Sequence, residues 1–169
     1  MVRNNQPLSI RRATVDDLPT LQAIYAHARS FMKANGNPSQ WKDNRPKASA
    51  IDEDLHLQRM YVMEDENGIH GVFALVSGPD PTYGEIEGAW KNEEPYLVLH
   101  RLASDGQVHG LFDQMVAFAR TFGMDLRIDT HENNAIMRHL IEKNGFDYCG
   151  IILTDDGTPR LAYHSTDTR

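Results

Sequence analysis

The stretch that most constrains the fold covers residues 125–150, DLRIDTHENNAIMRHLIEKNGFDYCG. Apolar and polar residues alternate from Leu126 to His131, which is the period of a β-strand with two unlike faces. Four apolar residues then recur at helical spacing: Ile136, Met137, Leu140 and Ile141. Because residues 146–153 again suit a strand, the stretch predicts a strand–helix–strand unit of an α/β domain.

Both ends of the predicted helix carry stop and start signals. The side-chain oxygen of Asn133 or Asn134 can accept a hydrogen bond from the free N–H groups of the first turn. Gly145 suits a left-handed C-cap, and Lys143 lies in the last turn, where a cation is favoured. These features equally fit an ordinary structural βαβ piece, so alone they assign no function.

The rest of the chain reads as a regular series of strands and helices. The predicted strands cover residues 8–13, 60–64, 69–77, 96–102, 126–131, 146–153 and 159–164, and the predicted helices lie within 14–32, 48–59, 111–122 and 134–144. Glu66-Asn67-Gly68 supplies a hairpin turn. Residues 79–94 form an irregular insert, either a solvated hairpin or a wall that faces a cationic amine.

Composition narrows the class of protein. The chain has 169 residues, so we expect one domain over residues 1–169. No apolar run approaches the ~20 residues of a membrane helix, and the polar start does not suit a signal peptide. The net charge is −7 without a Lys/Arg cluster, which argues against nucleic acid and favours cationic ligands. The single Cys149 suits a core strand residue and a reducing cytoplasm, so we expect a cytoplasmic protein without membrane partners.

The spacing from Asn134 to Gly145-Phe146 resembles the end of the GCN5-related N-acetyltransferase (GNAT) domain. The family pattern is Asn-x-x-Ala-x-x-x-Tyr-x-x-x-Gly-Phe. Met137 stands here at the Ala position and Ile141 at the Tyr position. The opening residues 10–18, IRRATVDDL, also resemble the start of that domain, and the order of predicted elements resembles the family nearly end to end.

The resemblance implies a fold and a co-substrate. The fold would be α/β (α+β), with a mixed, mostly antiparallel sheet of about seven strands and about four flanking helices. The fourth and fifth strands, residues 96–102 and 126–131, would splay apart. Acetyl-CoA would lie in the gap, with its pantetheine paired to the fourth strand and its pyrophosphate at the following loop.

The loop before the third helix matches the family's pyrophosphate pattern, (Gln/Arg)-x-x-Gly-x-(Gly/Ala), only in part. Gln107 and Gly110 match, whereas Phe112 replaces the last small residue and would crowd the diphosphate. By resemblance, the expected acetyl-CoA contacts are His100, Arg101, Leu102, Gln107, Val108, His109, Gly110, Leu111, Phe112, Asn134 and Met137.

Acetyl transfer to an amine requires a group that removes the proton of an ammonium ion. The candidates near the expected gap are His100 and His131, with Glu87 as a carboxylate that acts through water. A structural role as a polar strand-end residue is the alternative for each histidine. Backbone N–H groups at residues 100–102 would stabilise the oxyanion. Ile141 cannot protonate the leaving thiolate, as the family Tyr does.

The acceptor pocket is predicted from three residues: Trp41, Glu85 and Trp90. Trp41 could instead anchor its own loop. The eight His residues show no metal-ligand spacing, so we expect no metal site. The main hypothesis is an N-acetyltransferase that moves an acetyl group from acetyl-CoA to a primary amine of a small molecule or peptide. The competing hypothesis is a non-catalytic module on the same fold that binds an acyl-CoA or senses another ligand. The oligomeric state stays open, with a homodimer among the alternatives.

Overall fold

The computed structural model describes residues 7–42 and 44–167. The polar residues 1–6, on which the expectation about a signal peptide rests, lie outside this part. The described elements follow the predicted order: β1 (Ser9–Arg12), η1 (Val15–Asp17), α1 (Leu18–Ala34), α2 (Ala48–His56), β2 (Met60–Asp65), β3 (Gly68–Ser77), η2 (Pro81–Tyr83), β4 (Glu87–Gly88), β5 (Tyr96–Ser104), α3 (Leu111–Arg120), β6 (Asp125–Thr130), α4 (Ala135–Lys143), β7 (Asp147–Leu153) and β8 (Pro159–Ser165). Among these residues, no helix combines the length and the apolar character that crossing a bilayer requires.

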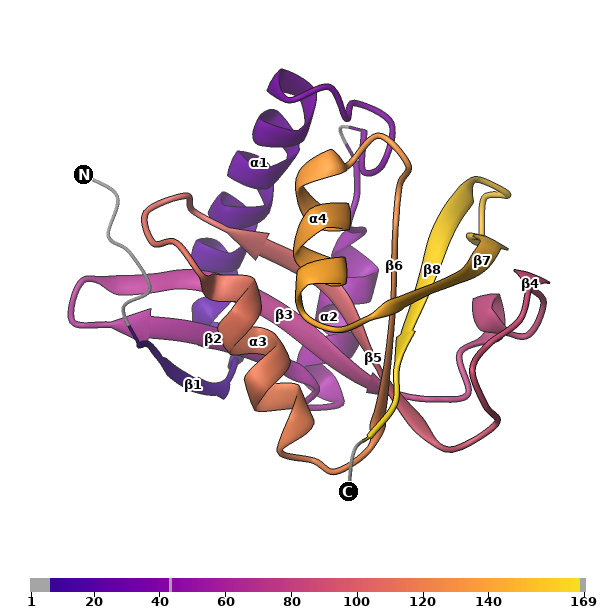
Figure 1. Cartoon of the computed structure of the whole chain (residues 1–169). Helices are drawn as coiled ribbons and strands as arrows, with labels where there is room; N and C mark the ends of the chain where they lie inside the picture. The colour runs from indigo at the N-terminus through magenta and orange to yellow at the C-terminus, as the bar shows by residue number, and fades with distance from the viewer. Residues whose placement is uncertain (1–6, 43, 168–169) are drawn as a thin grey trace.

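One open sheet organises the molecule, with the strand order β1-β2-β3-β5-β6-β8-β7-β4 (Figure 1). Neighbouring strands are antiparallel except β5 and β6, which are parallel. The parallel pairing joins residues 96–98 of β5 to residues 125–127 of β6. Beyond these residues the two strands are no longer paired. The predicted fold class and the splay between the fourth and fifth predicted strands, which are β5 and β6, are therefore confirmed.

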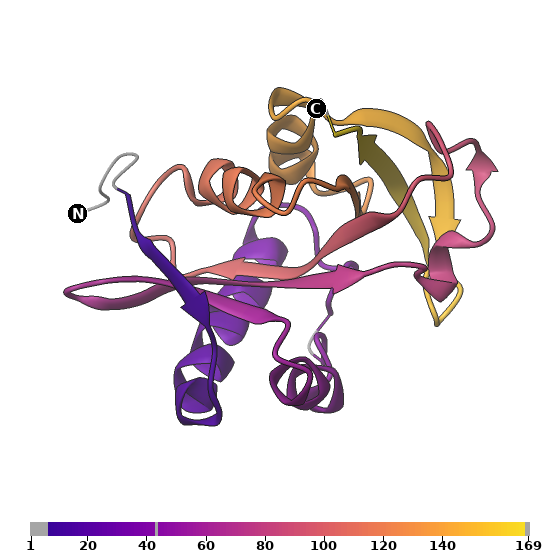
Figure 2. The same ribbon diagram turned by 90° about the horizontal axis from the view of Figure 1, so that it is seen from below.

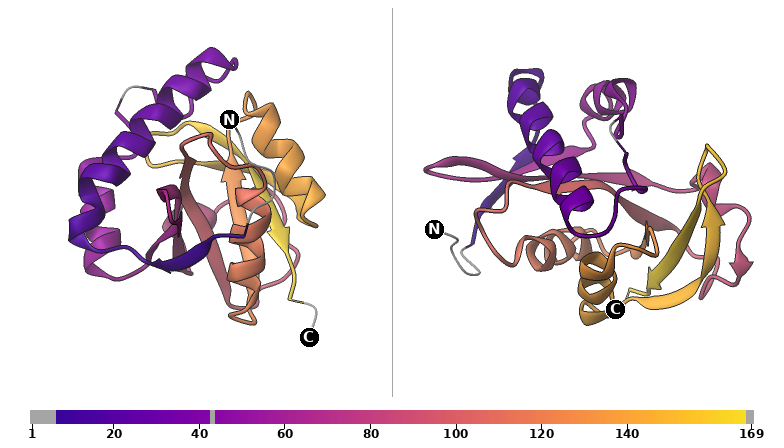
Figure 3. Two further views of the ribbon diagram at one scale, coloured as in Figure 1. Left: turned by 90° about the vertical axis from the view of Figure 1, so that its left-hand side faces the viewer. Right: turned by 90° about the horizontal axis from the view of Figure 1, so that it is seen from above.

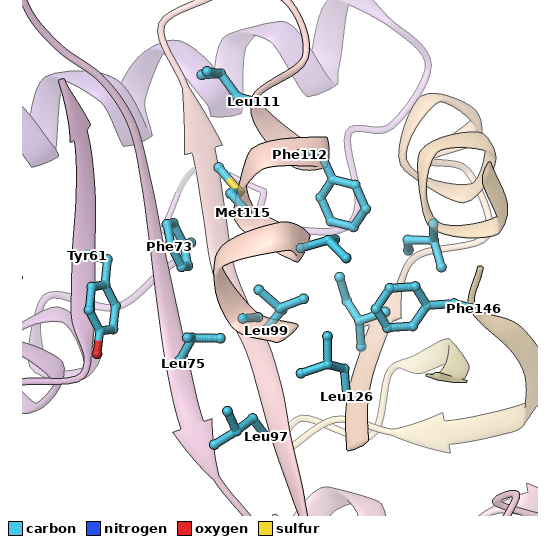
Figure 4. Close-up of a cluster of buried hydrophobic side chains, with 14 of the residues drawn as sticks. Tyr61, Phe73, Leu75, Leu97, Leu99, Leu111, Phe112, Met115, Leu126 and Phe146 are labelled. Carbon is cyan, nitrogen blue, oxygen red and sulfur yellow. The ribbon is translucent and has the colours of Figure 1, made fainter. Parts of the chain in front are cut away.

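Helices cover both faces of the sheet. Helices α1 and α2 lie on one face and α3 and α4 on the other, as Figure 2 and the right-hand view of Figure 3 show. The larger hydrophobic cluster fills the space beneath α3 and α4, where Leu99, Phe112, Leu126 and Phe146 converge (Figure 4). A second cluster, which includes Leu21, packs α1 and α2 against β2 and β3.

Helix α4 begins and ends as its sequence predicts. Asn134 is the N-cap, because its Oδ1 accepts a hydrogen bond from Met137 N at 3.1 Å, which decides between Asn133 and Asn134. At the other end Gly145 has φ of 84°, and Phe146 N donates to Ile141 O at 3.3 Å. Ile141 is fully buried in the larger hydrophobic cluster.

The insert is anchored to the sheet, although much of it is exposed. Tyr83 is buried, and Trp90 Nε1 donates to its carbonyl oxygen at 3.0 Å. Strand β4, which the sequence pattern did not predict, pairs with β7 beside Gly150. Gly88 permits this approach, because a Cβ there would lie 2.2 Å from Cys149 O. The insert therefore packs against the β8–β7 end of the sheet.

Candidate active site

A pocket of about 560 Å³ opens where β5 and β6 part. Its lining includes residues 99–102 of β5, residues 128–130 of β6, the start of α4, the loop between α1 and α2, and the hairpin between β7 and β8. Met32 of α1, two residues of α2 and Arg160 of β8 line it as well. Residues 80–82 of the insert complete the wall. The pocket thus lies across the gap in which the sequence resemblance places acetyl-CoA and its acceptor.

Strand alternation divides the gap into two faces. Leu99 and Ile128 belong to the apolar cluster beneath α3 and α4. His100 and Asp129, which follow them in sequence, therefore point to the opposite face. Asp129 pairs with Ala162 of β8, so Arg160, two residues away, lies on that same face. Three charged or polar side chains from three strands thus share one wall of the pocket.

A β-bulge lies in β5 at the edge of the gap. His100 pairs with Ala74 and Ala103 with Val72, so Arg101 and Leu102 together face one residue of β3. Arg101 has φ of 52°, and its carbonyl oxygen accepts a hydrogen bond from the Tyr25 hydroxyl at 2.8 Å. The bulge therefore takes the backbone of residues 101–102 out of the regular ladder where the gap opens.

A buried carboxylate holds this bulge to helix α2. Asp54 is fully buried and accepts hydrogen bonds from Arg101 Nε at 2.5 Å and Arg101 Nη2 at 2.8 Å. Arg59 Nε donates to the same carboxylate at 2.7 Å. Because two guanidinium groups face one carboxylate, its negative charge is compensated and the position of Arg101 is fixed.

His100 forms a dyad with Asp80 on the pocket wall. His100 Nε2 lies 2.8 Å from Asp80 Oδ2, and Thr82 donates to Asp80 Oδ1 from both its backbone N and its hydroxyl. Burial alone would raise the pKa of Asp80, but the hydrogen bonds from His100 and Thr82 outweigh it and lower the pKa to about 2. Asp80 is thus ionised at neutral pH and can accept a hydrogen bond from Nε2–H of His100, and in that tautomer Nδ1 is the nitrogen that can accept a proton.

A second carboxylate, Asp129, lies on the same wall. Tyr83 donates its hydroxyl to Asp129 Oδ2 at 2.6 Å. Burial and the charge of Asp129 raise the pKa of Tyr83 well above its ordinary value, so the phenol stays protonated and remains a donor. Tyr83 thereby orients a carboxylate that can attract a cationic amine.

His131 is placed differently from His100. It follows β6, is buried, and accepts a hydrogen bond from Asn133 N on its Nδ1 at 3.0 Å. Burial and the nearby charge of Arg160 lower the pKa of His131. His131 is absent from the pocket lining, and its ring supports the turn that leads into α4.

Of the three residues predicted to form the acceptor pocket, only Trp41 lines the observed pocket. Trp41 lines the pocket and packs edge-on against Tyr25, with ring centroids 5.7 Å apart. Trp90 packs on Tyr83 outside the pocket lining. Glu85 is exposed on the insert and does not line the pocket. The same holds for Glu87, the carboxylate predicted as a base.

Of the residues expected to contact acetyl-CoA, some line the pocket and others do not. His100, Arg101, Leu102, Asn134 and Met137 line the pocket, whereas residues 107–112 do not. Gly110, with φ of 80°, precedes α3, and no side chain caps the helix there. Gln107 and His109 are exposed, while Val108 and Leu111 are buried. The Phe112 ring is 5% exposed and packs in the core, so it points away from the surface where a diphosphate would lie.

Sequence reasoning missed the charged residues of this wall and the residue that joins its parts. Asp80, Asp129 and Arg160 come from an insert and two strands, and no motif links them. Gln40 Oε1 accepts hydrogen bonds from Asn134 Nδ2 at 3.2 Å and from His131 N at 3.3 Å, which ties the α1–α2 loop to the start of α4. A charged residue on a strand face that should be buried, such as Arg160, was the available signal.

No group of three or more His, Cys, Asp or Glu side chains in the described part of the chain could hold a metal ion. The polar groups of the site instead form the His100–Asp80 dyad, the contact of Asp54 with Arg101 at the bulge, and the charged wall of the pocket. These arrangements suit binding and proton transfer.

Comparison with known proteins shows which solved structures the chain resembles. No protein-family model and no curated protein sequence matches the chain. Among solved structures, it is similar to a GNAT-family acetyltransferase from Streptococcus agalactiae 2603, with a TM-score of 0.84 and 28% identity over 96% of each chain. A GNAT-family acetyltransferase from Listeria monocytogenes 4b F2365 gives a TM-score of 0.71 at 20% identity over 94% of each chain.

A larger enzyme shares the fold as well. N-acetylglutamate synthase from Neisseria gonorrhoeae, solved with coenzyme A and N-acetylglutamate, gives a TM-score of 0.60 at 14% identity, over 98% of this chain and 36% of that one. The splayed sheet, the order of its elements and the similarity to the streptococcal protein together indicate that the chain is an acyltransferase with the GNAT fold.

Proposed function

We propose that this acyltransferase moves an acetyl group from acetyl-CoA to a primary amine of a small molecule or peptide. The observation that carries the proposal is the gap between β5 and β6, which opens beside a histidine–aspartate dyad and a second carboxylate. The gap offers unpaired strand edge for an acyl carrier, and its charged wall offers groups for an amine.

Several residues suit acetyl-CoA, which would supply the acyl thioester. Beyond Val98, β5 has no ladder with β6, so its edge can pair with the pantetheine amides as with an added strand. The start of α3 beyond Gly110 presents backbone N–H groups that suit a diphosphate. Asn134 and Met137 line the same pocket as residues 99–102 of β5. The coenzyme A complex of the structurally similar N-acetylglutamate synthase supports the same choice of carrier.

His100 is the residue that we propose removes the proton from the amine. An alkylamine of pKa ~10 is mostly ammonium at neutral pH, so the proton must leave before attack. His100 Nδ1 accepts it, and the ionised Asp80 on Nε2 stabilises the imidazolium that forms. Backbone N–H groups at the bulge, residues 100–102, donate to the developing oxyanion.

The leaving thiolate departs without a tyrosine. Ile141, at the position of the family Tyr, is fully buried and has no proton to give. A thiol has pKa ~8.5, so its thiolate is a tolerable leaving group near neutral pH. Acetyl transfer by this route therefore requires a base that removes the proton of the amine, but it does not require an acid at residue 141.

The experiment that tests the proposal measures release of free thiol from acetyl-CoA, with and without a panel of primary amines. We expect release that requires both an amine and the protein, together with the N-acetylated product by mass spectrometry. Tight binding of coenzyme A by calorimetry with no release for any amine would instead support the non-catalytic acyl-CoA-binding module.

A further inference from the structure

Arg160 is a buried cation on the acceptor wall of the pocket. The residue is 8% exposed and lines the pocket beside Asp129. Its Nη2 donates to Gln40 O at 2.9 Å and its Nη1 to Pro159 O at 3.0 Å. These two bonds fix the guanidinium plane between β8 and the α1–α2 loop, and they leave further N–H donors unused.

Among the described residues, Arg160 has no directly paired carboxylate, unlike the partly buried Arg101 and Arg59. Within residues 7–42 and 44–167, no carboxylate lies within 4.0 Å of it. Arg101 and Arg59, by contrast, share Asp54. Arg127 also lacks a carboxylate, but it is held over the ring of Trp90 at 4.1 Å and does not line the pocket. Among these four, Arg160 alone combines burial, a place in the pocket lining and the lack of a directly paired carboxylate.

The carboxylates nearest to Arg160 have other partners. Asp129 accepts a hydrogen bond from the Tyr83 hydroxyl. Asp155 and Asp156, on the β7–β8 hairpin, pair with Arg45 at 3.4 and 3.8 Å. Their charges favour the cationic form of Arg160, yet burial dominates and lowers its pKa. A buried cation without a directly paired carboxylate is costly, and a ligand carboxylate would complete its hydrogen bonds.

We infer that Arg160 binds a carboxylate of the acceptor, so that the substrate is a small amino acid rather than a simple amine. The inference rests on the proposed function and names the acceptor of the same site. A guanidinium with free, coplanar donors matches a carboxylate in two parallel hydrogen bonds. In the order of strands across the sheet, His100 lies on β5, Asp129 on β6 and Arg160 on β8. A carboxylate bound at Arg160 therefore leaves His100 and Asp129 to face the amine.

The test compares each of the common L-amino acids with its own carboxamide in the thiol-release assay. The amide of each pair keeps the side chain and the amine and loses only the anionic group. Its amine is also less basic, which favours the amide chemically and makes the comparison stringent. We expect at least one acid to exceed its amide by about 10²-fold in kcat/KM. Amides that match or exceed their acids throughout the panel would overturn the inference.

A variant ties the preference to Arg160. Arg160→Gln should lower kcat/KM for the preferred acid by about 10²-fold and change the value for its amide by less than about 3-fold. Arg12→Gln, at an exposed position on β1, is the matched control and should change neither. An equal loss on acid and amide would show that Arg160 serves the fold or the common chemistry, and so would contradict carboxylate recognition.

A binding measurement separates this inference from the proposed function. Calorimetry on the protein saturated with coenzyme A compares the same acid and amide without turnover. Tighter binding of the acid, lost in Arg160→Gln while coenzyme A affinity stays constant, supports the inference even if no amine is acetylated. If amines are acetylated but the acid binds no better than its amide, the proposed function stands and the inference fails.

Discussion

The two faces of the gap between β5 and β6 differ in what they offer a ligand. Toward α3 and α4 the strands present Leu99 and Ile128, which are part of the apolar core. Toward α1, α2 and the insert they present His100 and Asp129, with Arg160 beside them. A ligand on the first side meets backbone and apolar groups, whereas one on the second meets charges. This contrast suits a carrier common to a whole family on one side and a particular acceptor on the other.

The charged face itself contains two kinds of site. Asp54 is surrounded by two guanidinium groups that complete its hydrogen bonds, so its cluster serves the fold. Arg160 donates to two carbonyl oxygens and pairs with no carboxylate among the described residues, so its charge can bind an anionic group of a ligand. The experiments below break or sharpen these contrasts, beginning with the largest expected effect.

Removing the carboxylate of Asp54 should cost the most stability. Asp54→Asn leaves Arg101 and Arg59 partly buried without their counterion, and breaking such a pair typically costs about 3 kcal/mol of unfolding free energy. The measurement is chemical denaturation at neutral pH. Asp52→Asn, on the exposed side of α2, is the control and should change the value by less than about 0.5 kcal/mol.

Arg160→Gln supplies the other half of this comparison. The substitution removes a buried cation that has no directly paired carboxylate among the described residues, so we expect the unfolding free energy to stay within about 1 kcal/mol of wild type or to rise. A loss as large as that of Asp54→Asn would mean that Arg160 is also a structural cation, and the contrast between the two clusters would disappear.

Replacing His100 should have the next largest effect, on turnover. His100→Gln keeps a side chain that can reach Asp80 but removes the base, so kcat should fall about 10²-fold while coenzyme A affinity changes little. That loss corresponds to about 2.7 kcal/mol of activation free energy. His131→Gln is the matched comparison and should retain most turnover, because the His131 ring supports a turn outside the pocket lining. The reverse result would move the base to the end of β6.

The two faces also differ in how far sequence could predict them. The apolar face follows from local rules: alternation gives the strands, helical spacing gives α3 and α4, and Asn134 and Gly145 give the helix ends. Phe112 illustrates the limit, since its departure from the loop pattern suggested crowding, whereas the ring packs in the core. Burial of one side chain depends on neighbours that only the tertiary structure brings together.

The charged face could not be predicted because its parts are distant in the chain. Asp80 meets His100 across the end of β3, and Arg160 meets Gln40 across 120 positions. The carboxylates that composition and the insert favoured, Glu85 and Glu87, point to solvent instead. Net negative charge suggested cationic ligands without indicating that the pocket would hold a buried cation. Pairings of this kind follow from strand order and register, which the local pattern does not contain.

A moderate effect is expected at the start of α4, on the carrier side of the gap. Asn134→Ala removes the cap on Met137 N and the bond to Gln40, which should cost about 1 kcal/mol of stability. Asn133→Ala is the matched control, because Asn133 is exposed and does not cap the helix. Calorimetry with coenzyme A then sharpens the comparison of faces. Weaker binding only in Asn134→Ala supports contact with the carrier, whereas unchanged affinity makes the residue a cap alone.

The smallest effect should be a pH dependence at His70, where the loop that leads to α3 is anchored. His70 is buried, with Nδ1 2.8 Å from Asp105 Oδ2 and Nε2 2.9 Å from Asp65 Oδ1. Asp105 Oδ1 in turn accepts a hydrogen bond from Gln107 N at 3.0 Å. Burial alone would lower the pKa of His70, but the two carboxylates outweigh it, so the folded pKa lies above the unfolded value. The imidazolium therefore stabilises the fold fully below the unfolded pKa of ~6.5, and this contribution is lost as pH rises through the folded pKa.

We therefore expect the difference in unfolding free energy between wild type and His70→Gln to be largest in mildly acidic solution and to shrink as the pH rises. Denaturation curves at a series of pH values measure it, with His139→Gln, at an exposed position on α4, as the control. A difference that does not vary with pH would show that His70 stays neutral between its two carboxylates. A parallel decline in coenzyme A affinity with pH, lost in His70→Gln, would link this anchor to the carrier side of the gap through Asp105 and Gln107, because the same hydrogen bonds hold the loop.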